Sequence, residues 1–432
     1  MAKKIKLGVF GLGVVGCGLV NIVNGRREAL SQAHGIELEI VKAVVRDPTK
    51  KRPADLFGIQ VSTDMNSILD DDTLDLVVEL IGGMEPAFTI IKSALARGKP
   101  VVSANKALIA EHGPEILNLA RQAKRPFFAE ASVGGGIPIL KTLRESLVAN
   151  EITAVTAIIN GTTNFILTKM EEEGLSYYEA LKIAGERGFA EADPTMDVEG
   201  FDAAQKLRIL AAHTLGGRYP QGDILCEGVS GLTEHHFAFA RKHGFAIKLL
   251  ALARRRADAL ELRVHPTLIP RLHPLASVRN EFNAIYLIGD AVGEIMLSGR
   301  GAGSLPTASA VYADIVDICT RTTTIEASVE SAPAAWPTRV LPADEAQSEY
   351  YLHFTVLDKP GVIGEIATVL GRHHISVRSA AAELVPNVEE VGELDVIVHR
   401  SRERDVRQAI AEIDKLERTR GQGKLIRIAR DL

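Results

Sequence analysis

Short apolar runs alternate with longer amphipathic segments over residues 1–131. Each run has the length and the branched apolar side chains of a buried strand, and the runs lie at 5–10, 37–45, 74–80, 100–104 and 126–131. Between the third and fourth runs, residues 86–97 carry apolar side chains at helical spacing. Strands that alternate with helices predict a parallel sheet with helices on its faces, so the predicted fold class is α/β.

The pattern changes after residue 150. Expected strands lie at 152–159, 246–254, 260–265, 284–288 and 292–297. Expected helices lie at 161–173, where Asn160 is the candidate cap, and at 177–187. This arrangement predicts an α+β domain over residues 132–330. Its last helix, after Pro306, is apolar through Ala310, Ile315 and Ile318, and we expect it to pack back on the first domain.

A third unit is predicted beyond a linker. Residues 331–348 are rich in Ala, Pro and Glu, a composition typical of linkers. Residues 349–425 then predict a strand, a helix, two strands and a helix, at 351–357, 362–372, 375–384, 393–399 and 403–416. A βαββα order of this length predicts a compact α+β module on a tether.

A glycine motif follows the first strand directly. Gly11, Gly13 and Gly16 fit GxGxxG, and Val14 and Val15 open the next helix, which we expect to end near Asn24. In this context the motif predicts dinucleotide binding in a Rossmann domain. Gly11 permits the tight turn, Gly13 lets the backbone approach a pyrophosphate, and Gly16 allows close helix packing. The helix N-terminus would hold the phosphates. A glycine turn in another kind of α/β protein is the alternative.

Arg46 ends the second strand, where a Rossmann sheet meets the adenosine ribose. An acidic residue at this place favours the free 2′-hydroxyl of NAD, and an Arg accommodates the 2′-phosphate of NADP. Both occur here, since Asp47 follows Arg46, with Lys50 and Lys51 just beyond. We therefore predict NADP as the cofactor and keep NAD open. A solvated basic turn is the alternative.

Lys106 falls in the first turn of the helix after the fourth strand, for which Asn105 is a candidate cap. A cation at a helix N-terminus opposes the helix dipole. Open α/β sheets bind ligands at the carboxyl ends of their strands. An unfavourable charge at this edge of the sheet therefore suggests function. We expect Lys106 near the nicotinamide end of the cofactor, and a solvated surface lysine is the alternative.

The helix predicted after Gly200 is apolar on nearly every side, which indicates burial. It nevertheless carries Asp202 and Lys206, which are four residues apart and share one face. An exposed ion pair is the simpler interpretation. In buried surroundings both charges must be satisfied, and a lysine in a desolvated cleft can exchange a proton near neutral pH. Asp202 would then orient this lysine or bind substrate.

Two places raise the question of a cation. Glu130 precedes a loop with glycines at 134–136, whose exposed backbone oxygens suit a hard cation, although a hinge is the simpler interpretation. The pairs His235-His236 and His373-His374 lack other ligands at metal spacing, so we expect solvated or core histidines there.

The composition narrows the function classes. A formal net charge of -5 leaves no basic footprint, so nucleic acid and anionic membranes are not expected partners. No apolar run reaches the roughly 18 residues of a membrane helix. The first apolar run leads into the glycine loop, which indicates a strand and not a signal peptide. Widely spaced cysteines without a CxxC indicate reduced thiols and a cytoplasmic location; they are Cys17, Cys226 and Cys319.

The segment 184–206 resembles the signature of the homoserine dehydrogenase family. The matching positions are Ala184, Gly188, Phe189, Ala190, Asp193-Pro194, Asp197-Val198, Gly200, Asp202 and Lys206. The loop GLGVVG, the segment SANKAL around Lys106 and the segment NGTTNFIL are also similar to that family, over residues 5–320. The tail, with DKPG at 358–361, resembles an ACT domain, a module that binds small amino acids. Its segment ISVRSAAAEL departs from the ACT pattern.

The resemblance implies reversible reduction of L-aspartate 4-semialdehyde to L-homoserine with NAD(P)H, a step toward threonine, methionine and isoleucine. Lys206 would donate the proton to the developing alkoxide, and Lys106 would assist at this oxygen or hold the nicotinamide. Glu191 and Asp202 would bind the ammonium group or the hydroxyl of the substrate.

The resemblance also implies further ligand positions. Gly188 and Gly303 are similar to loop positions that close over the cofactor. A sodium ion (Na+) would be held by Glu130 and by the backbone carbonyls of Val133, Gly135 and Ile137. The ACT-like tail implies L-threonine as a candidate effector.

Two other functions stay open from the sequence. Another Rossmann reductase, such as a dihydrodipicolinate reductase, would share the glycine loop without the Asp202 and Lys206 signature. An NAD(P)-binding amino-acid sensor would need no pair of lysines among acidic residues. A homodimer or homotetramer is expected, because the second sheet and the ACT-like module both offer strand edges.

Overall fold

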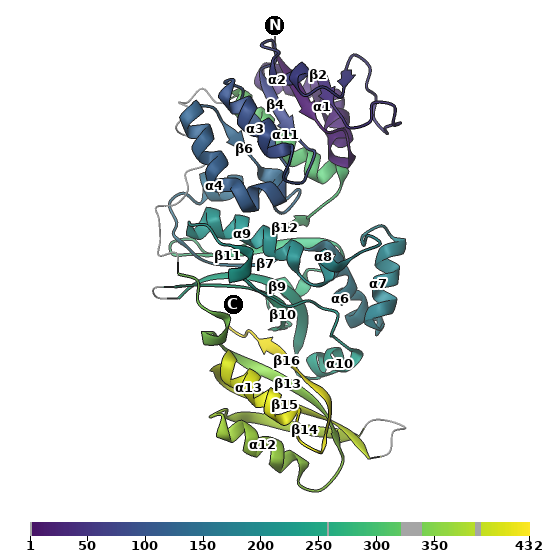
Figure 1. Cartoon of the computed structure of the whole chain (residues 1–432), viewed down its shortest axis with the longest axis vertical. Coiled ribbons are helices and arrows are strands. Elements are labelled where there is room, and N and C mark those ends of the chain that lie inside the picture. Colours follow the sequence, from purple (N-terminus) through teal and green to yellow (C-terminus); the bar gives the residue numbers. More distant parts are fainter. Residues whose placement is uncertain (1, 257–258, 321–338, 385–389) are drawn as a thin grey trace.

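The computed structural model describes residues 2–256, 259–320, 339–384 and 390–432. Three domains follow one another along the long axis of the molecule, with the N-terminal domain at one end and the C-terminal module at the other (Figure 1). None of the described helices combines the length and apolarity needed to span a bilayer.

The N-terminal domain holds the predicted parallel sheet. Its six strands have the order β3-β2-β1-β4-β5-β6 and all pair in parallel. They are β1 Lys3–Phe10, β2 Ile36–Val44, β3 Gln60–Ser62, β4 Leu76–Glu79, β5 Val101–Ser103 and β6 Phe127–Phe128, and their helices are α1 Val14–His34, α2 Asn66–Leu69, α3 Ala87–Ala96 and α4 Lys106–Ala123. The strand order reverses beside β1, so a crevice forms at the carboxyl ends of β1 and β4.

Two residue patterns explain how this domain forms. Strand β1 is fully buried at Leu7 and Val9, as its apolar sequence predicts for a central parallel strand. Helix α1 runs about ten residues past the predicted end near Asn24, because its polar stretch faces solvent while Leu30 stays buried. The helix ends at Gly35, which adopts a left-handed φ of 66°.

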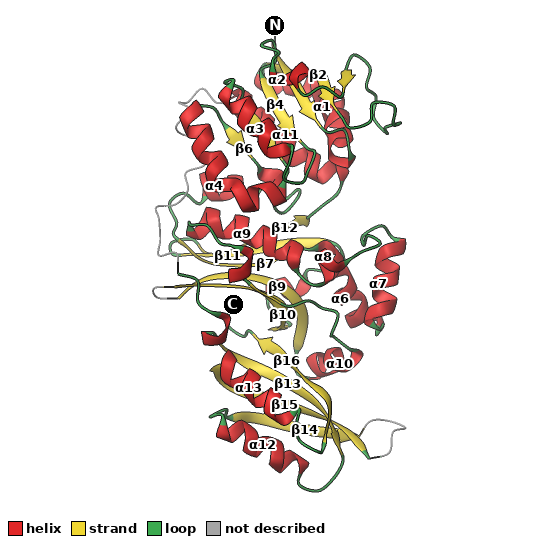
Figure 2. Cartoon of the chain, viewed as in Figure 1, coloured by secondary structure: helices red, strands yellow, loops and turns green. Residues whose placement is uncertain are grey.

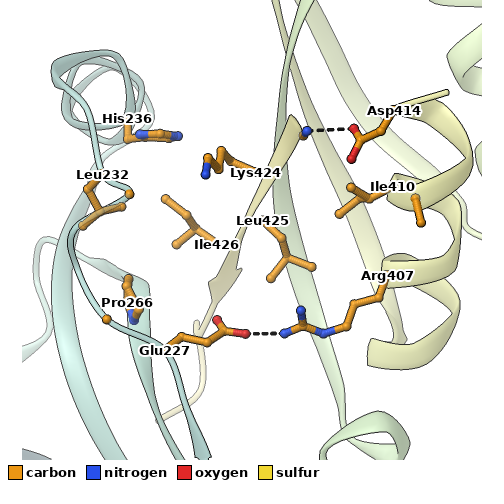
Figure 3. A pocket seen from close by; sticks show the side chains of 14 residues that line it. Glu227, Leu232, His236, Pro266, Arg407, Ile410, Asp414, Lys424, Leu425 and Ile426 are labelled. Carbon is orange, nitrogen blue, oxygen red and sulfur yellow. Dashed lines mark hydrogen bonds and ion pairs between the residues drawn. The ribbon is translucent and has the colours of Figure 1, made fainter. Parts of the chain in front are cut away.

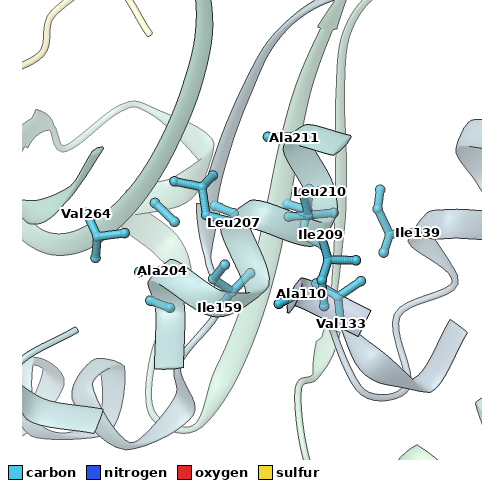
Figure 4. Close-up of a cluster of buried hydrophobic side chains, with 14 of the residues drawn as sticks. Ala110, Val133, Ile139, Ile159, Ala204, Leu207, Ile209, Leu210, Ala211 and Val264 are labelled. Atoms are coloured by element: carbon cyan, nitrogen blue, oxygen red, sulfur yellow. The ribbon is translucent and has the colours of Figure 1, made fainter. Parts of the chain in front are cut away.

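The central domain builds an antiparallel sheet whose strands have the order β12-β11-β7-β9-β10. The strands are β7 Ile152–Ile158, β9 Phe245–Arg256, β10 Ala259–Pro270, β11 Phe282–Gly289 and β12 Gly293–Arg300, with the short β8 Leu225–Cys226 beside β10. Its main helices are α6 Gly161–Glu173, α7 Tyr177–Glu186, α8 Thr195–Val198, α9 Phe201–Leu215 and α10 Glu234–Lys242. Figure 4 shows the apolar side chains of α9 packed on both sides, as expected for a buried helix.

Helix α11 (Ser304–Thr320) leaves β12 and returns to the N-terminal domain. Its residues Val311 and Ile315 share one core with Leu19 and Val23 of α1, and Figure 1 shows the green helix beside the purple one. A Cβ on Gly18 would lie 2.7 Å from the backbone oxygen of Ser304, so only glycine permits this close packing.

The C-terminal module contains one strand more than predicted. Its elements are β13 Gln347–Leu357, α12 Val362–Arg372, β14 Val377–Leu384, β15 Val391–Arg402, α13 Glu403–Ile413 and β16 Thr419–Ile428. The prediction of βαββα stops before β16, because Gly421, Gly423 and the polar residues between them hide the strand pattern. The module therefore begins at Gln347, inside the expected linker, and extends past residue 425.

Strand β16 also joins the module to the central domain. It pairs antiparallel with β13 and parallel with β10, where Thr267 lies opposite Arg427 and Leu268 opposite Ile428. One ten-stranded sheet thus runs through both domains, as Figure 2 shows in yellow. The module is held by this pairing as well as by its linker, of which residues 331–338 lie outside the described residues.

Candidate active site between the N-terminal and central domains

Helix α4 of the N-terminal domain packs against helix α9 of the central domain, and both begin at the site. Asn105 caps α4 as predicted, since its Oδ1 accepts the N–H of Leu108 at 3.2 Å. Its Nδ2 donates to the backbone oxygen of Gly83 at 2.6 Å. The cap therefore ties the start of α4 to the loop after β4 and orients Lys106.

Asp202 is the centre of the site and is only 3% exposed. Its Oδ2 accepts a hydrogen bond from Lys206 Nζ at 2.7 Å and one from Asn160 Nδ2 at 2.9 Å, while Oδ1 accepts from Lys106 Nζ. Burial raises the pKa of Asp202, but the charges of Lys206 and Lys106 outweigh burial and hold the pKa well below its usual range. The carboxylate is therefore ionised at neutral pH.

The two lysines differ in exposure. The side chain of Lys206 is 11% exposed, and its Nζ also donates to the backbone oxygen of Ile159 at 2.8 Å. The side chain of Lys106 is 45% exposed. The Asp202 and Lys206 pair is thus buried and not a surface ion pair. Two ammonium groups around one carboxylate leave one net positive charge, which suits a developing oxyanion.

Asn160 belongs to the hydrogen-bonded group around Asp202, although the sequence placed it only as a cap. Its Oδ1 does cap α6, accepting the N–H of Thr163 at 2.8 Å. Its Nδ2 is then left to donate both to Asp202 and to Asp197, the latter at 2.7 Å. An Asn that caps a helix through its Oδ1 keeps an NH₂ group free to bond elsewhere. This free group was the sequence signal that Asn160 could also bond to residues of the site.

Glu191 and Gly188 lie on the loop between α7 and α8. Glu191 is exposed and forms no hydrogen bond or ion pair with other residues that the structure describes. Gly188 adopts a left-handed φ of 74° with open space around it. The structure accordingly does not connect either residue to Asp202 through a bond.

The glycine motif has the geometry expected of a phosphate-binding loop. A Cβ on Gly11 would lie 2.7 Å from the backbone oxygen of Leu80, and one on Gly16 would lie 2.2 Å from that of Gly11. Around Gly13 no described heavy atom lies within 4 Å of that position, so its backbone is open to a ligand. Helix α1 starts at the next residue and directs its N-terminus to the same place.

Two side chains missed by sequence reasoning brace this loop. Arg52 donates through Nε to the backbone oxygen of Leu12 at 3.2 Å and through its other nitrogens to those of Asp47 and Lys50, both at 2.7 Å. Ser304 Oγ donates to the backbone oxygen of Val14 at 2.7 Å. The contact of Arg52 with Leu12 spans 40 residues and that of Ser304 with Val14 spans 290, which leaves no local signal for either.

Gly303 precedes Ser304 and adopts a φ of 119°, so the structure places it next to the glycine loop.

Arg46 is exposed just after β2 and bonds to no other described residue, which leaves its guanidinium available. At the end of β4, the carboxylate of Glu79 accepts from Ile81 N at 2.8 Å and from Ser103 Oγ at 2.6 Å, while burial raises its pKa.

Glu130 is buried at the start of the loop that enters the central domain. Its two carboxylate oxygens accept the backbone N–H groups of Leu140 at 2.8 Å and Lys141 at 2.6 Å. The backbone oxygens of Val133 and Gly135 accept no hydrogen bond from the described residues. Ile137 O accepts from Ile139 N at 2.8 Å.

His235 lies next to histidine and acidic side chains that its sequence neighbours do not reveal. Its Nε2 lies 3.0 Å from Asp395 Oδ1, and His353 Nδ1 lies 3.1 Å from the same oxygen. One ligand atom of each residue lies within 4.8 Å of the others, a grouping able to hold a metal ion. The cluster joins α10 to β13 and β15, so the sequence spacing on which the expectation was based does not detect it.

The comparisons with known proteins agree with this geometry. A family model of homoserine dehydrogenase matches residues 138–316, one of its NAD-binding domain matches residues 11–130, and one of the ACT domain matches residues 350–418. A homoserine dehydrogenase of Synechocystis sp. is 41% identical over 98% of this chain and 99% of its own. The chain belongs to the homoserine dehydrogenase family.

Other homoserine dehydrogenases agree over the full length. The Bacillus subtilis relative is 38% identical over 96% of both chains. The crystal structure from Thiobacillus denitrificans has a TM-score of 0.91 with 39% identity and covers 99% of both chains. A hyperthermophilic archaeal homoserine dehydrogenase in complex with NADPH has a TM-score of 0.61 and 26% identity, covering 74% of this chain and 99% of its own.

Family membership makes the chain an oxidoreductase that interconverts L-aspartate 4-semialdehyde and L-homoserine with a nicotinamide cofactor, in amino-acid biosynthesis. The C-terminal module is an ACT domain. The non-catalytic sensor and the other Rossmann reductases are thereby set aside.

Proposed function

We propose that Lys206 donates the proton in the reduction of the aldehyde. The nicotinamide supplies a hydride to the carbonyl carbon, which leaves negative charge on the carbonyl oxygen. Lys206 Nζ has three N–H groups and gives two of them to Asp202 and Ile159, so one remains for this oxygen. Lys106 assists at the same oxygen from the more exposed side of Asp202.

The acidic residues take different parts in this proposal. Glu191 is exposed and unpaired among the described residues, which suits it to bind the ammonium group of the amino-acid substrate. Asp202 binds the hydroxyl end of the substrate together with the two lysines that it holds. Asn160 fixes Asp202 from behind and ties it to Asp197.

For the cofactor we propose NADP, with NAD as the weaker ligand. The guanidinium of Arg46 at the end of β2, which bonds to no other described residue, supports this preference, because a bidentate Arg suits a 2′-phosphate. Gly11, Gly13, Val14, Val15 and Gly16 would bind the pyrophosphate, and Gly188 and Gly303 would close over the cofactor.

A sodium ion is proposed at the loop after Glu130. The backbone oxygens of Val133 and Gly135 without hydrogen-bond donors among the described residues fit a hard cation, together with Ile137 O and the Glu130 carboxylate. Turnover and melting temperature should fall when NaCl is replaced by choline chloride at equal ionic strength. Equal values in both salts would contradict the site.

Regulation and assembly are proposed from the ACT domain and the sheet edges. L-threonine is the proposed effector of the ACT domain.

Edge strand β14 has all eight residues exposed, and β12 is the other edge of the ten-stranded sheet, which favours a homodimer or homotetramer. Light scattering tests the mass. The free cysteines support a cytoplasmic location, which cell fractionation tests.

The observation that carries the function is the binding of Lys106 and Lys206 to the buried carboxylate of Asp202, in a chain whose glycine loop after β1 is open at Gly13. The test is NADPH oxidation with L-aspartate 4-semialdehyde, followed by absorbance with and without L-threonine. We expect turnover with this substrate and slower turnover with L-threonine. No turnover with either nicotinamide cofactor would contradict the proposed roles.

A further inference from the structure

Three side chains from three elements meet where the central domain joins the ACT domain. His235 lies in the first turn of α10, His353 on β13 and Asp395 on β15. The Nε2 atom of His235 lies 3.0 Å from Asp395 Oδ1, and Nδ1 of His353 lies 3.1 Å from the same oxygen. One ligand atom of each side chain lies within 4.8 Å of the other two. We call these three residues the interdomain cluster.

The packing of α10 fixes the place of His235 in this cluster. Phe239, one turn further along the same helix, stacks on Tyr351 of β13 with ring centroids 3.9 Å apart, and both rings are buried. Lys242 at the end of α10 pairs with Glu383 of β14 at 2.6 Å. The helix is therefore held against the ACT domain by contacts other than the cluster, so the ligand atoms are preorganised.

Two further side chains orient the cluster. Glu393 Oε2 lies 3.0 Å from Nε2 of His353, the ring nitrogen that Asp395 does not use. Tyr351 donates its hydroxyl proton to Asp395 Oδ1 at 2.7 Å. A metal-bound histidine almost always donates its second ring N–H to a carboxylate, a backbone carbonyl or a water, which fixes the tautomer and leaves the other nitrogen for the metal. Glu393 is placed to do this for His353.

Hydrogen bonds alone satisfy this arrangement poorly. In a neutral ring of His353, a proton on Nε2 toward Glu393 leaves a lone pair on Nδ1, which then faces Asp395 Oδ1. With protons alone, His353 must be cationic to bond to both carboxylates, and Asp395 Oδ1 must accept from three donors with two lone pairs. A metal ion removes both demands, because it takes one lone pair from each of the three ligands and leaves one on Oδ1 for Tyr351.

The neighbouring His236 takes no part in the cluster. Its Nδ1 accepts the backbone N–H of Thr233 at 2.9 Å, and Figure 3 shows its ring extending toward Lys424 of β16. The ring is thus committed to the start of α10, and His235 is the member of the pair that reaches the metal ligands.

We propose that His235, His353 and Asp395 bind one divalent transition-metal ion with the ligand preferences of zinc, and that this ion clamps the central domain to the ACT domain. Imidazole and carboxylate together suit such ions, whereas sodium and magnesium prefer oxygen ligands alone. Because the ligands come from both domains, the binding energy of the ion favours their docked arrangement. The proposal goes beyond the catalytic function and does not rest on it.

The distances fit a zinc ion with little movement. Zinc holds nitrogen and oxygen ligands at about 2.0–2.2 Å, so the ligand atoms of a tetrahedral site lie about 3.4 Å apart. The two nitrogen–oxygen distances of 3.0 and 3.1 Å need to grow by only a few tenths of an ångström. The side chain of His235 is 30% exposed, which gives the ion a way in and leaves the fourth position for water.

Calorimetric titration of the EDTA-treated full-length protein with ZnCl₂, in excess MgCl₂, tests the site. We expect one tightly bound Zn²⁺ per chain, which Mg²⁺ does not displace. Titration with CoCl₂ should give the visible absorption of four-coordinate cobalt, which reports the ligands directly. Elemental analysis of the dialysed protein measures the stoichiometry independently.

Substitutions of the two histidines locate the ion. His235→Asn and His353→Asn should each weaken Zn²⁺ binding by at least tenfold and remove the cobalt absorption. His235 is partly exposed on a helix, so its substitution tests the site without disturbing the core of the ACT domain. His374→Asn, an exposed histidine of the ACT domain outside the cluster, is the matched control and should bind Zn²⁺ as the wild type does.

The clamp has a readout of its own. Zn²⁺ should raise the melting temperature of the wild type and of His374→Asn, but not that of His235→Asn. Absence of a bound Zn²⁺ in the wild type, a loss below tenfold in either cluster variant, or an equal loss in His374→Asn would overturn the proposed site. Binding that leaves the melting temperature of the wild type unchanged would contradict the clamp.

Discussion

The proposed chemistry depends on a few individual residues, because the carboxylate of Asp202 accepts hydrogen bonds from two lysines. Asp202 accepts from Lys106, Lys206 and Asn160, and each of these residues comes from a different segment of the chain. Removing either lysine leaves the carboxylate with two donors. Such variants therefore test chemistry without leaving a buried charge unpaired.

Replacing Lys206 with Met should lower kcat by about 10²-fold or more, the usual contribution of a positioned proton donor. NADPH affinity should stay nearly unchanged, because the proposal places Lys206 at the substrate oxygen. Steady-state kinetics and fluorescence titration of NADPH measure the two quantities. Lys182→Met, an exposed lysine of the central domain, is the matched control. Near-normal turnover of Lys206→Met would remove this lysine from the role.

Substitutions of Arg46 and Arg52 should distinguish recognition of the 2′-phosphate from stabilisation of the glycine loop. Arg46→Ala should weaken NADPH far more than NADH, because only NADPH carries the 2′-phosphate. Arg52→Ala should weaken both cofactors alike, because Arg52 braces the glycine loop through Leu12. Dissociation constants for both cofactors with both variants test this pattern. Equal losses of NADPH and NADH in Arg46→Ala would exclude contact with the phosphate.

At the scale of elements, two glycine loops meet where the chain passes between the first two domains. Gly135 adopts a φ of 57°, and a Cβ there would lie 2.4 Å from the backbone carbon and oxygen of Gly301. The loop after Glu130 and the loop after β12 are therefore packed backbone to backbone. This packing precedes α11, whose first residue braces the cofactor loop.

Gly135→Ala should destabilise the protein by more than about 1 kcal/mol, since the new methyl group meets backbone and the φ is left-handed. Gly25→Ala in helix α1, where the space around the Cβ position is open, should instead stabilise it by roughly 0.4–1 kcal/mol. Urea denaturation of both variants measures the two effects. A neutral Gly135→Ala would show that the two loops separate at little cost.

The sequence pattern predicts helix bounds and caps well where the stabilising contacts lie between residues close in the chain. The helix predicted at 362–372 begins and ends where α12 does, and the caps predicted at Asn105 and Asn160 are confirmed. Strand β16 was missed because its stability depends on pairing with β10 and β13, and not on its own residues.

The whole molecule is joined across its second and third domains by an ionic network. Glu227 of the central domain binds Arg427 of β16 at 2.6 Å and Arg407 of α13, and Glu403 binds both arginines. Burial raises the pKa of Glu227, but the hydrogen bonds and charges of Arg427 and Arg407 outweigh burial and lower it from 4.5 to about 2.

Acid should therefore weaken this junction. Because the folded-state pKa of Glu227 lies below its ordinary value, its ionised form stabilises the folded chain above pH 4.5, and this stabilisation is lost as the pH falls toward 2. Glu227→Gln should be less stable than the wild type at neutral pH, with a difference that shrinks on acidification. Urea midpoints above and below pH 4.5 measure it.

Glu417→Gln, an exposed acidic residue of the ACT domain, is the control for this comparison and should follow the wild type at both pH values. A difference between wild type and Glu227→Gln that stays constant with pH would contradict an ionised interdomain group.

The sequence by itself determined the parts that depend on neighbouring residues. The glycine motif, the alternation of strands and helices, the helix caps and the signature around Asp202 and Lys206 all act over a few residues, so their spacing is visible in the chain. Tertiary structure alone decided which groups meet. Lys106 reaches Asp202 across 96 residues, Ser304 reaches Val14 across 290, and His235 meets Asp395 across 160. No local pattern encodes such contacts, because they form only when separate elements pack on one another.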